Sequence, residues 1–314
     1  MFNASDFIKS KSGIILKSAV SEDLQQSELN EILLPDLDIE TLRNSDALLL
    51  AYAKQRRPDL DFGESNEARL KGLIRYHQFQ NLNQMSFFSD IVQIINKEHI
   101  VPLLHYDVAF KVYIPDYHQV LYNTAIIIET EKQYSFLQKK FQEAGYVVTI
   151  RGNFFIITAK EPSQKRVIVF NSFLFGKKRE KLLHNVFSRA KEEMIFHTRC
   201  FIPSVEDLIC GLINEICMKL KSEDVAHGLA FDIWNLYTMK KKYDISWDKF
   251  KSLLIENNMI AKYNIVGSFV NDIIADLVPM DLFDEKTISS AMKSYVWHER
   301  AVYIYLKVRC LFFK

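Results

Sequence analysis

The feature that most constrains the fold of this chain is a change in hydrophobic period near residue 100. From about residue 21 to 96, apolar residues recur at the spacing of helices that bury one face. Short runs rich in β-branched and aromatic residues then follow, as strands require: IVPLL, TAIII, YVVTI, NFFIITA and RVIVFNSF. A helical stretch, Lys132 to Ala144, separates the second run from the third, and Gly145 fits the position that ends a helix.

From about residue 176 the sequence again favours helices to its end. This order predicts an α+β protein with a small mixed sheet and a crossover helix, flanked by helical regions. We expect an N-terminal helical region at 1–99, an α/β core at 100–175 and a C-terminal helical region at 176–314. Within 64–99, the apolar residues expected to pack inward are Leu70, Leu73, Ile74, Phe79, Phe87, Phe88, Ile91, Ile94 and Ile95.

The composition argues against several classes of protein. The 40 basic and 39 acidic residues nearly cancel, so the chain carries no general nucleic-acid signature. No run reaches the ~20 apolar residues that a membrane span needs. The first twenty residues carry no small-residue cleavage site, so we expect a cytoplasmic protein. Glycine (9) and proline (7) are scarce, which favours long helices over a turn-rich β architecture.

The four cysteines all lie in the C-terminal half of the chain, at Cys200, Cys210, Cys217 and Cys310. His197 with the first three would make a nominal set of four zinc ligands, but their spacing matches no usual zinc pattern. Without an export signal, buried thiols are expected instead of disulfides, and no metal site is predicted.

Residues 100–146 have a distinctive order. An apolar strand (Ile100 to Leu104) leads into an amphipathic segment and a Tyr-x-Pro-Asp turn, then a second strand (Ala125 to Ile128) and a helix closing at Gly145. This order resembles a family of uncharacterised bacterial nucleotidyltransferases, of the superfamily that includes polymerase-β-like enzymes. Five other segments are similar to that family: Leu42 to Arg57, Asn81 to Pro102, Ile202 to Leu208, Phe231 to Tyr237 and Ile245 to Trp247.

The resemblance implies a site at the second strand. Nucleotidyl transfer of this type uses carboxylates on neighbouring strands to hold two divalent cations roughly 3.5–4 Å apart. In the family, Lys-Gly follows the first strand and Asp-x-Asp opens the second. Here those positions carry His105-Tyr106 and Asn123-Thr124-Ala125, so Asn123 and Ala125 stand as degenerate catalytic positions.

The other family positions are also replaced. The family's arginine falls near Gln119, its third acid near Val169, and the histidine that follows on Asn171. His105 and Lys111 remain as candidate residues for binding a nucleotide phosphate. The resemblance thus implies a degenerate member of the family, in which no expected metal ligand is intact.

A displaced set of acids is the alternative: Asp107, Glu129 and Glu131, with Lys111 beside them. Glu129 and Glu131 share a face if the second strand continues through them, because alternate side chains of a strand point the same way. The plainer interpretation is that these acids are solvated charges at a strand end and at helix starts.

Two hypotheses follow. In the first, the chain is a pseudoenzyme that binds a ligand or partner, a nucleotide or a protein, with no cofactor. In the second, it is an active enzyme that uses Mg²⁺, a nucleoside triphosphate and the displaced acids. An aromatic stripe near the C-terminus is expected to be core or interface: Tyr295, Trp297, Tyr303, Tyr305, Phe312 and Phe313.

Overall fold

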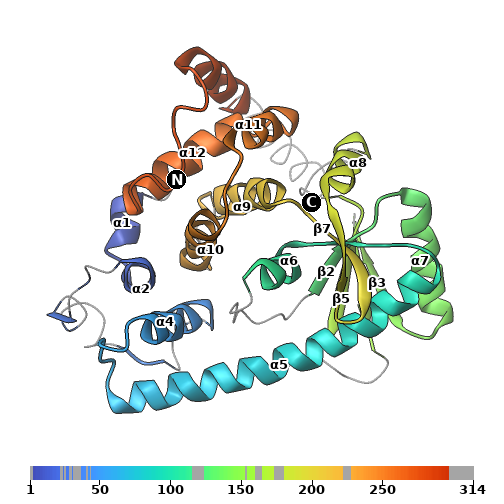
Figure 1. Cartoon of the computed structure of the whole chain (residues 1–314), viewed down its shortest axis with the longest axis horizontal. Coiled ribbons are helices and arrows are strands. Elements are labelled where there is room, and N and C mark those ends of the chain that lie inside the picture. Colours follow the sequence, from blue (N-terminus) through green and yellow to red (C-terminus); the bar gives the residue numbers. More distant parts are fainter. Residues whose placement is uncertain are drawn as a thin grey trace, which may run out of the picture.

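A computed structural model describes residues 3–21, 24, 26–27, 30, 37–39, 42, 44–114, 124–152, 154–159, 165–172, 180–221 and 228–296. Within them a mixed sheet lies at one end of the molecule and helices make up the rest, which confirms the α+β class (Figure 1). The most C-terminal aromatic residues of the predicted stripe, from Trp297 onward, lie outside these ranges.

Short capped helices open the chain at the end of the molecule away from the sheet (Figure 1). The Asn3 side chain accepts a hydrogen bond from the Ser5 amide at 2.9 Å, and the Ser10 hydroxyl accepts one from the Gly13 amide at 3.1 Å. The N-terminal helices are α1 (Ala4–Ile8), α2 (Lys11–Val20), α4 (Asn44–Arg56) and α5 (Glu64–Lys97).

The 34-residue helix α5 links the helical part to the sheet and, at ~1.5 Å per residue, extends about 51 Å. Phe87, Phe88, Ile91 and Ile95 are buried, as predicted. The prediction that Phe79 packs inward is wrong, because its side chain is 61% exposed. The inner face is lined by residues seven apart such as buried His77 and Gln84, and Phe79 lies about 200° around the helix from His77.

The sheet has seven strands in the order β3-β4-β5-β2-β1-β7-β6. β2 pairs parallel with β5 and antiparallel with β1, and β1 pairs parallel with β7; the other pairs are antiparallel. The strands are β1 (Leu103–Leu104), β2 (Thr124–Ile127), β3 (Val147–Arg151), β4 (Phe154–Thr158), β5 (Arg166–Phe170), β6 (Lys191–Ile195) and β7 (Thr198–Ile202).

Two helices connect the first strands. α6 (Tyr106–Tyr113) follows β1, and α7 (Glu131–Glu143) is the predicted crossover helix after β2. The Thr130 hydroxyl caps α7 by accepting a hydrogen bond from the Gln133 amide at 3.2 Å. Gly145 has φ +80°, so the predicted helix-ending glycine is confirmed.

α8 (Glu180–Arg189) lies between β5 and β6. The helices after β7 are α9 (Val205–Lys219), α10 (Leu229–Lys242), α11 (Trp247–Glu256) and α12 (Ile260–Ile273), and residues 285–296 are also helical. The prediction of uninterrupted helix after residue 176 is wrong, because β6 and β7 form a hairpin. Phe196 and His197 make its turn with φ of +51° and +61°. Such turns usually carry Asn-Gly or Asp-Gly, so the usual turn signal is absent here.

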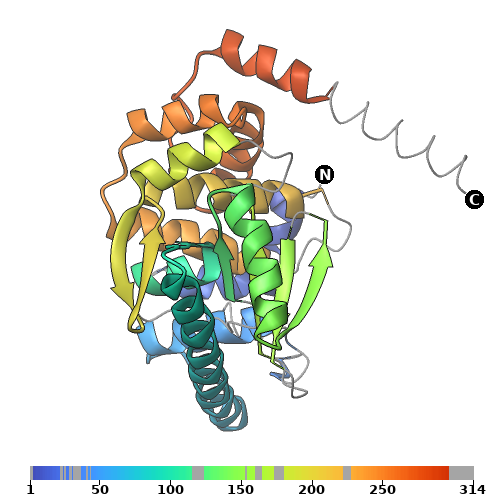
Figure 2. The same ribbon diagram turned by 90° about the vertical axis from the view of Figure 1, so that its right-hand side faces the viewer.

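The two faces of the sheet are covered differently. On one face, strand residues such as Ile126, Val167 and Val169 join the main core with α5 and α7, and that core continues into the helical part. On the other face, a second apolar cluster forms with α8. Figure 2 shows α5 extending well beyond the sheet. Among the helices in the described ranges, none has both the length and the apolar character that crossing a bilayer requires.

Candidate functional site

Of the two degenerate catalytic positions that the resemblance implies, the structure describes Ala125, which lies on β2 at the centre of the sheet, between β1 and β5. Ala125 is opposite Ile168 of β5, and its carbonyl accepts a hydrogen bond from the His105 amide at 3.0 Å. Asn123, the other degenerate position, and Gln119 lie outside the described residues. The first strand, the second strand and β5 are therefore neighbours, with Ala125 between them.

Ala125 is buried in apolar surroundings. Its side chain is 7% exposed and belongs to the second cluster. Side chains from β1, β2 and β5 meet three side chains of α8 in that cluster: Leu103, Ala125, Ile127, Phe170, Leu183, Val186 and Phe187. This face of the sheet is thus a packed core beneath α8.

The two candidate phosphate-binding residues are not equivalent. His105 is 7% exposed, its ring stacks on the Phe170 ring with centroids 4.9 Å apart, and burial lowers its pKa to about 3. A neutral imidazole supplies no positive charge to a phosphate. Lys111 is half-buried in the last turn of α6, at the far end of that helix from His105. The two side chains therefore start from opposite ends of one helix.

Val169, near which the resemblance would put the third acid, lies on the opposite face of the sheet from Ala125. Val169 pairs with Ile126, and both belong to the main core, whereas Ala125 and Ile168 face the second cluster. An acid at Val169 would be separated from Ala125 by the sheet. Asn171 follows β5, is 9% exposed, and donates a hydrogen bond to the Glu131 carboxylate at 3.0 Å.

The structure describes the side chains of two of the three alternative acids, Glu129 and Glu131. Glu129 and Glu131 follow the carboxyl end of β2, but α6, which carries Asp107 in its first turn, begins beside Ala125. Glu129 follows Ala125 by four residues, so Glu129 lies further toward the carboxyl end of β2 than the start of α6 does. The side chain of Asp107 lies outside the described part of the structure.

Glu129 and Glu131 also differ in their partners. β2 ends at Ile127 and Glu131 already opens α7, so strand alternation does not align the two carboxylates. The Glu129 carboxylate lies 2.9 Å from Nδ1 of His184 on α8, while Glu131 contacts Asn171. The interpretation of Glu131 as a first-turn acid of a helix is confirmed.

The magnesium pair implied by the resemblance does not fit these residues. Neither Ala125 nor Val169 has a side-chain oxygen that could bind a metal ion. Over the part of the chain that the structure describes, no three His, Cys, Asp or Glu side chains gather as a metal site would require. Two-metal transfer needs several carboxylate oxygens at one place.

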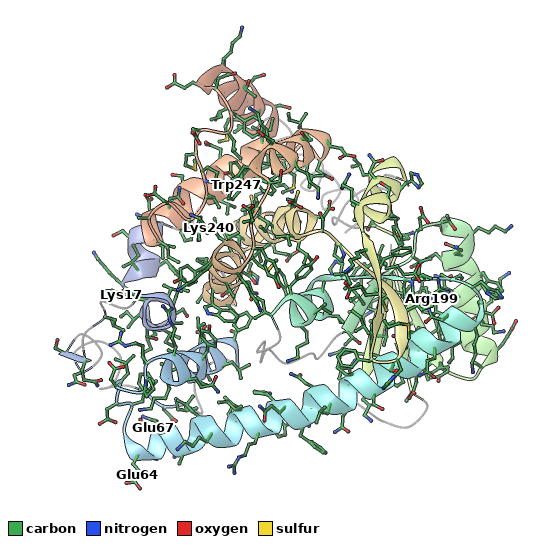
Figure 3. The ribbon with its side chains drawn as sticks, in the orientation of Figure 1. Lys17, Glu64, Glu67, Arg199, Lys240 and Trp247 are labelled. Atoms are coloured by element: carbon green, nitrogen blue, oxygen red, sulfur yellow. The ribbon has the colours of Figure 1, made fainter. Side chains whose placement is uncertain are left out.

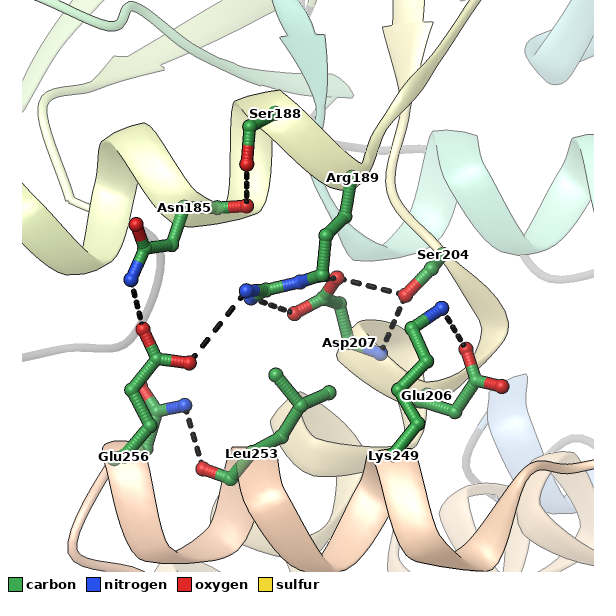
Figure 4. A network of polar contacts seen from close by, with 10 residues as sticks. Asn185, Ser188, Arg189, Ser204, Glu206, Asp207, Lys249, Leu253 and Glu256 are labelled. Carbon is green, nitrogen blue, oxygen red and sulfur yellow. Dashed lines mark hydrogen bonds and ion pairs between the residues drawn. The ribbon is translucent and has the colours of Figure 1, made fainter.

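Figure 4 shows the polar contacts of Glu206 and Asp207, the two acids of the Ile202 to Leu208 segment. Ser204 caps α9, accepting from the Asp207 amide at 3.2 Å and donating to the Asp207 carboxylate at 2.7 Å. Arg189 of α8 binds the same carboxylate through Nε at 3.1 Å and Nη2 at 2.8 Å. The Asp207 side chain is 2% exposed, so this acid is committed to joining α8 and α9.

The network extends to α11. Glu256 accepts hydrogen bonds from Asn185 and, at 3.5 Å, from Arg189 (Figure 4). Glu206 accepts one from Lys249 at 2.9 Å. Although burial acts in the other direction, the Lys249 contact lowers the pKa of Glu206. These charged groups fix three helices to one another. Arg189 was not predicted as a network residue, because the only feature that marks it in the sequence is its place in the last turn of a helix.

The acid of the Phe231 to Tyr237 segment is Asp232, which forms an ion pair with Lys219 of α9. Burial raises the pKa of Asp232, and burial together with Asp232 raises that of Glu215. The pair is half-buried between α9 and α10 and far from β2 along the chain. It too is positioned to join helices.

A buried glutamine that the sequence did not single out holds the sheet to α5. Gln84 donates to the Thr124 hydroxyl at 2.9 Å and to the Arg166 carbonyl at 2.5 Å, and accepts from the Arg166 amide at 3.3 Å. Its position seven residues after His77 on the inner face was the available signal. It fixes the amino ends of β2 and β5.

Cys200, Cys210 and Cys217 are free and buried, as predicted, and burial raises the pKa of Cys200 to about 11 and of Cys210 to about 12. Cys310 lies outside the described ranges.

No protein-family model matches the chain, and neither does any curated protein or solved structure.

Proposed function

We propose that this chain is a nucleotidyltransferase-like pseudoenzyme that binds a ligand or a partner without transferring a nucleotidyl group. One observation carries the proposal. Ala125, at a position where the resemblance would put a metal-binding acid, is buried in an apolar cluster beneath α8. A packed apolar face cannot hold two divalent cations, because it offers them no oxygen ligands.

The surrounding acids support the same conclusion. Glu129, Glu131 and Asp207 each contact a basic or amide side chain, and the three contacts involve different partners. Recruiting them for metal binding would require breaking those contacts. β2 and β5, the strands on which the resemblance would put the acids, are neighbours in the sheet, but Val169 faces away from Ala125.

Pyrophosphate release tests the proposal. The protein is incubated with each nucleoside triphosphate and Mg²⁺ or Mn²⁺, alongside Glu129→Gln and Glu131→Gln. We expect no release above the protein-free blank for any of the three proteins. A matched control is Glu192→Gln, which removes an exposed acid paired with Arg199 on the β6–β7 hairpin.

Release by the unmodified protein that is lost in Glu129→Gln and kept in Glu192→Gln would overturn the proposal. That result would favour an active, Mg²⁺-dependent nucleotidyltransferase with displaced acids. Release that is equal in all variants and persists after further purification would also overturn the proposal, since it would come from an active site that depends on neither Glu129 nor Glu131. Release that disappears on further purification would come from a contaminating enzyme and would leave the expected blank value.

A further inference from the structure

The outer face of α5 carries an apolar stripe exposed to solvent. Tyr76, Phe79 and Leu82 are 54%, 61% and 72% exposed. They follow one another at intervals of three residues, so they lie side by side along the helix surface. Monomeric proteins seldom expose such a group of large apolar side chains without a binding role.

Small residues continue the stripe in both directions. Ala68, Gly72 and Ser86 are exposed on the same side of the helix. A Cβ atom built on Gly72 would meet no atom within 4 Å. A second helix can therefore approach the α5 backbone closely on either side of the three large residues.

The stripe is accessible along the length of α5. The helix forms an outer edge of the molecule (Figure 1), and its amino end, with Glu64 and Glu67, is distant from Arg199 near its other end (Figure 3). Asn96, in the last turn, holds that end to β7 by accepting from the Arg199 amide at 2.8 Å. This contact holds the carboxyl end of α5 against the sheet while its amino half extends past the sheet.

We propose that two copies of this chain associate through α5, packed antiparallel about a two-fold axis at Phe79. In this register Phe79 meets Phe79 of the second copy, and Tyr76 lies opposite Leu82, because both are three residues from the axis. Gly72 lies opposite Ser86, seven residues from the axis on either side. One stripe is therefore complementary to itself, as a two-fold interface requires.

The charges on α5 favour the same pairing. Its first turn is acidic, with Glu64 and Glu67, and its last turn is basic, with Lys97. The antiparallel register brings Glu64 within one turn of Lys97 of the second copy, and Asp90 within one turn of Lys71. A parallel pair would set Glu64 against Glu64 and align the two helix dipoles unfavourably. Charge complementarity thus selects a second copy in one orientation.

Sedimentation equilibrium over a range of protein concentrations tests the association. The unmodified protein is expected to dimerise, and Phe79→Glu and Leu82→Glu should each raise the dimer Kd at least tenfold, because each change acts twice at the centre of the interface. Ile150→Glu, at an equally exposed apolar residue of β3, should leave the Kd unchanged. Circular dichroism checks that each variant is folded.

Disulfide crosslinking tests the register. In a Cys310→Ser background the remaining cysteines are buried, so Phe79→Cys should crosslink to itself on oxidation. Asp90→Cys should not, because two copies of residue 90 would be about 33 Å apart at ~1.5 Å per residue. Lys97→Glu should weaken the dimer, and Glu64→Lys added to it should restore the affinity.

A protein that stays monomeric at every concentration would overturn the inference. So would a dimer that survives Phe79→Glu and Leu82→Glu, or a dimer in which Asp90→Cys crosslinks and Phe79→Cys does not. None of these results depends on whether the protein acts on nucleotides, so the outcome is separate from that of the pyrophosphate assay.

Discussion

At the scale of single residues, Glu129, Glu131 and Asp207 each contact a basic or amide side chain in the structure. Asp207 is the clearest case, since its carboxylate accepts from Arg189 and from the Ser204 hydroxyl, while its backbone amide donates to that same hydroxyl. A carboxylate that is 2% exposed and bound by a guanidinium contributes to the structure by holding helices together. Its removal leaves a charged guanidinium without that partner.

We therefore expect Asp207→Ala to lower the free energy of unfolding by about 2–4 kcal/mol, from the lost ion pair and the lost contact of the α9 cap. Urea denaturation measures the change. Arg199→Ala is the matched control, because its ion pair with Glu192 is exposed and should contribute less than about 1 kcal/mol. Equal losses in the two variants would show that Asp207 has no special structural role.

Ala125 gives a second prediction at this scale. Ala125→Asp places a carboxylate in an apolar cluster, so we expect the free energy of unfolding to fall by about 3 kcal/mol or more. Thr149→Asp, on the exposed strand β3, should cost much less. A stable Ala125→Asp variant that gains stability from Mg²⁺ would mean that this face is an open cleft.

The sequence could predict this position only in part. The resemblance identified Ala125 and Asn123 as replacements for acids. The side chains that cover Ala125 belong to α8, more than fifty residues later in the chain. The parallel register of β2 and β5, which puts Val169 on the opposite face, also depends on contacts between distant segments. Periodicity along one segment carries no information about either.

At the scale of secondary-structure elements, long helices and β-branched strands were predictable because their periods are local properties. The β6–β7 hairpin was missed because Phe196 and His197 adopt a positive φ without the usual glycine or asparagine. The direction of Phe79 was missed because an amphipathic helix with apolar residues on two sides does not reveal which side meets the core.

Glycine at position 13 allows α1 and α2 to lie close together. A Cβ atom there would come within 2.0 Å of the Phe7 carbonyl oxygen, a backbone atom that cannot move aside alone. Gly13→Ala should therefore lower the free energy of unfolding by about 2 kcal/mol or more. Thermal unfolding followed by circular dichroism measures the effect.

Gly72→Ala is the control for that change. It lies in the middle of α5 with open space around it, so the higher helix propensity of alanine should raise the free energy of unfolding by about 0.5–1 kcal/mol. The comparison is made at a protein concentration too low for dimers. Destabilisation by both substitutions would contradict the account of the close α1–α2 contact.

At the scale of the whole molecule, one core cluster joins the sheet to the helical part, and charged groups on α8, α9 and α11 reinforce that connection. Two histidines, His77 and His105, are also buried. Burial lowers the pKa of His105 to about 3 and also lowers that of His77, so both stay neutral in the folded protein at pH values where the unfolded chain takes up protons.

Stability should therefore fall as the pH drops from 6.5, the ordinary histidine value, toward about 3, because the unfolded chain binds more protons over that interval. Glu215 and Asp232 have raised pKa values, so their protonation favours the folded protein and makes stability rise as the pH drops. His105→Gln should lose less stability than the unmodified protein between pH 7.5 and 5, measured by urea denaturation. An unchanged acid sensitivity in His105→Gln would contradict a buried neutral imidazole.

The central claim is that the face of β2 facing α8 is a packed core and cannot hold the metals of nucleotidyl transfer. The most direct measurement is the melting temperature of the unmodified protein with each nucleoside triphosphate, in Mg²⁺ and in EDTA. We predict that any stabilisation by a triphosphate is the same in both. Stabilisation that requires Mg²⁺ and approaches about 2.7 kcal/mol at one hundred times the Kd of the complex would contradict the claim.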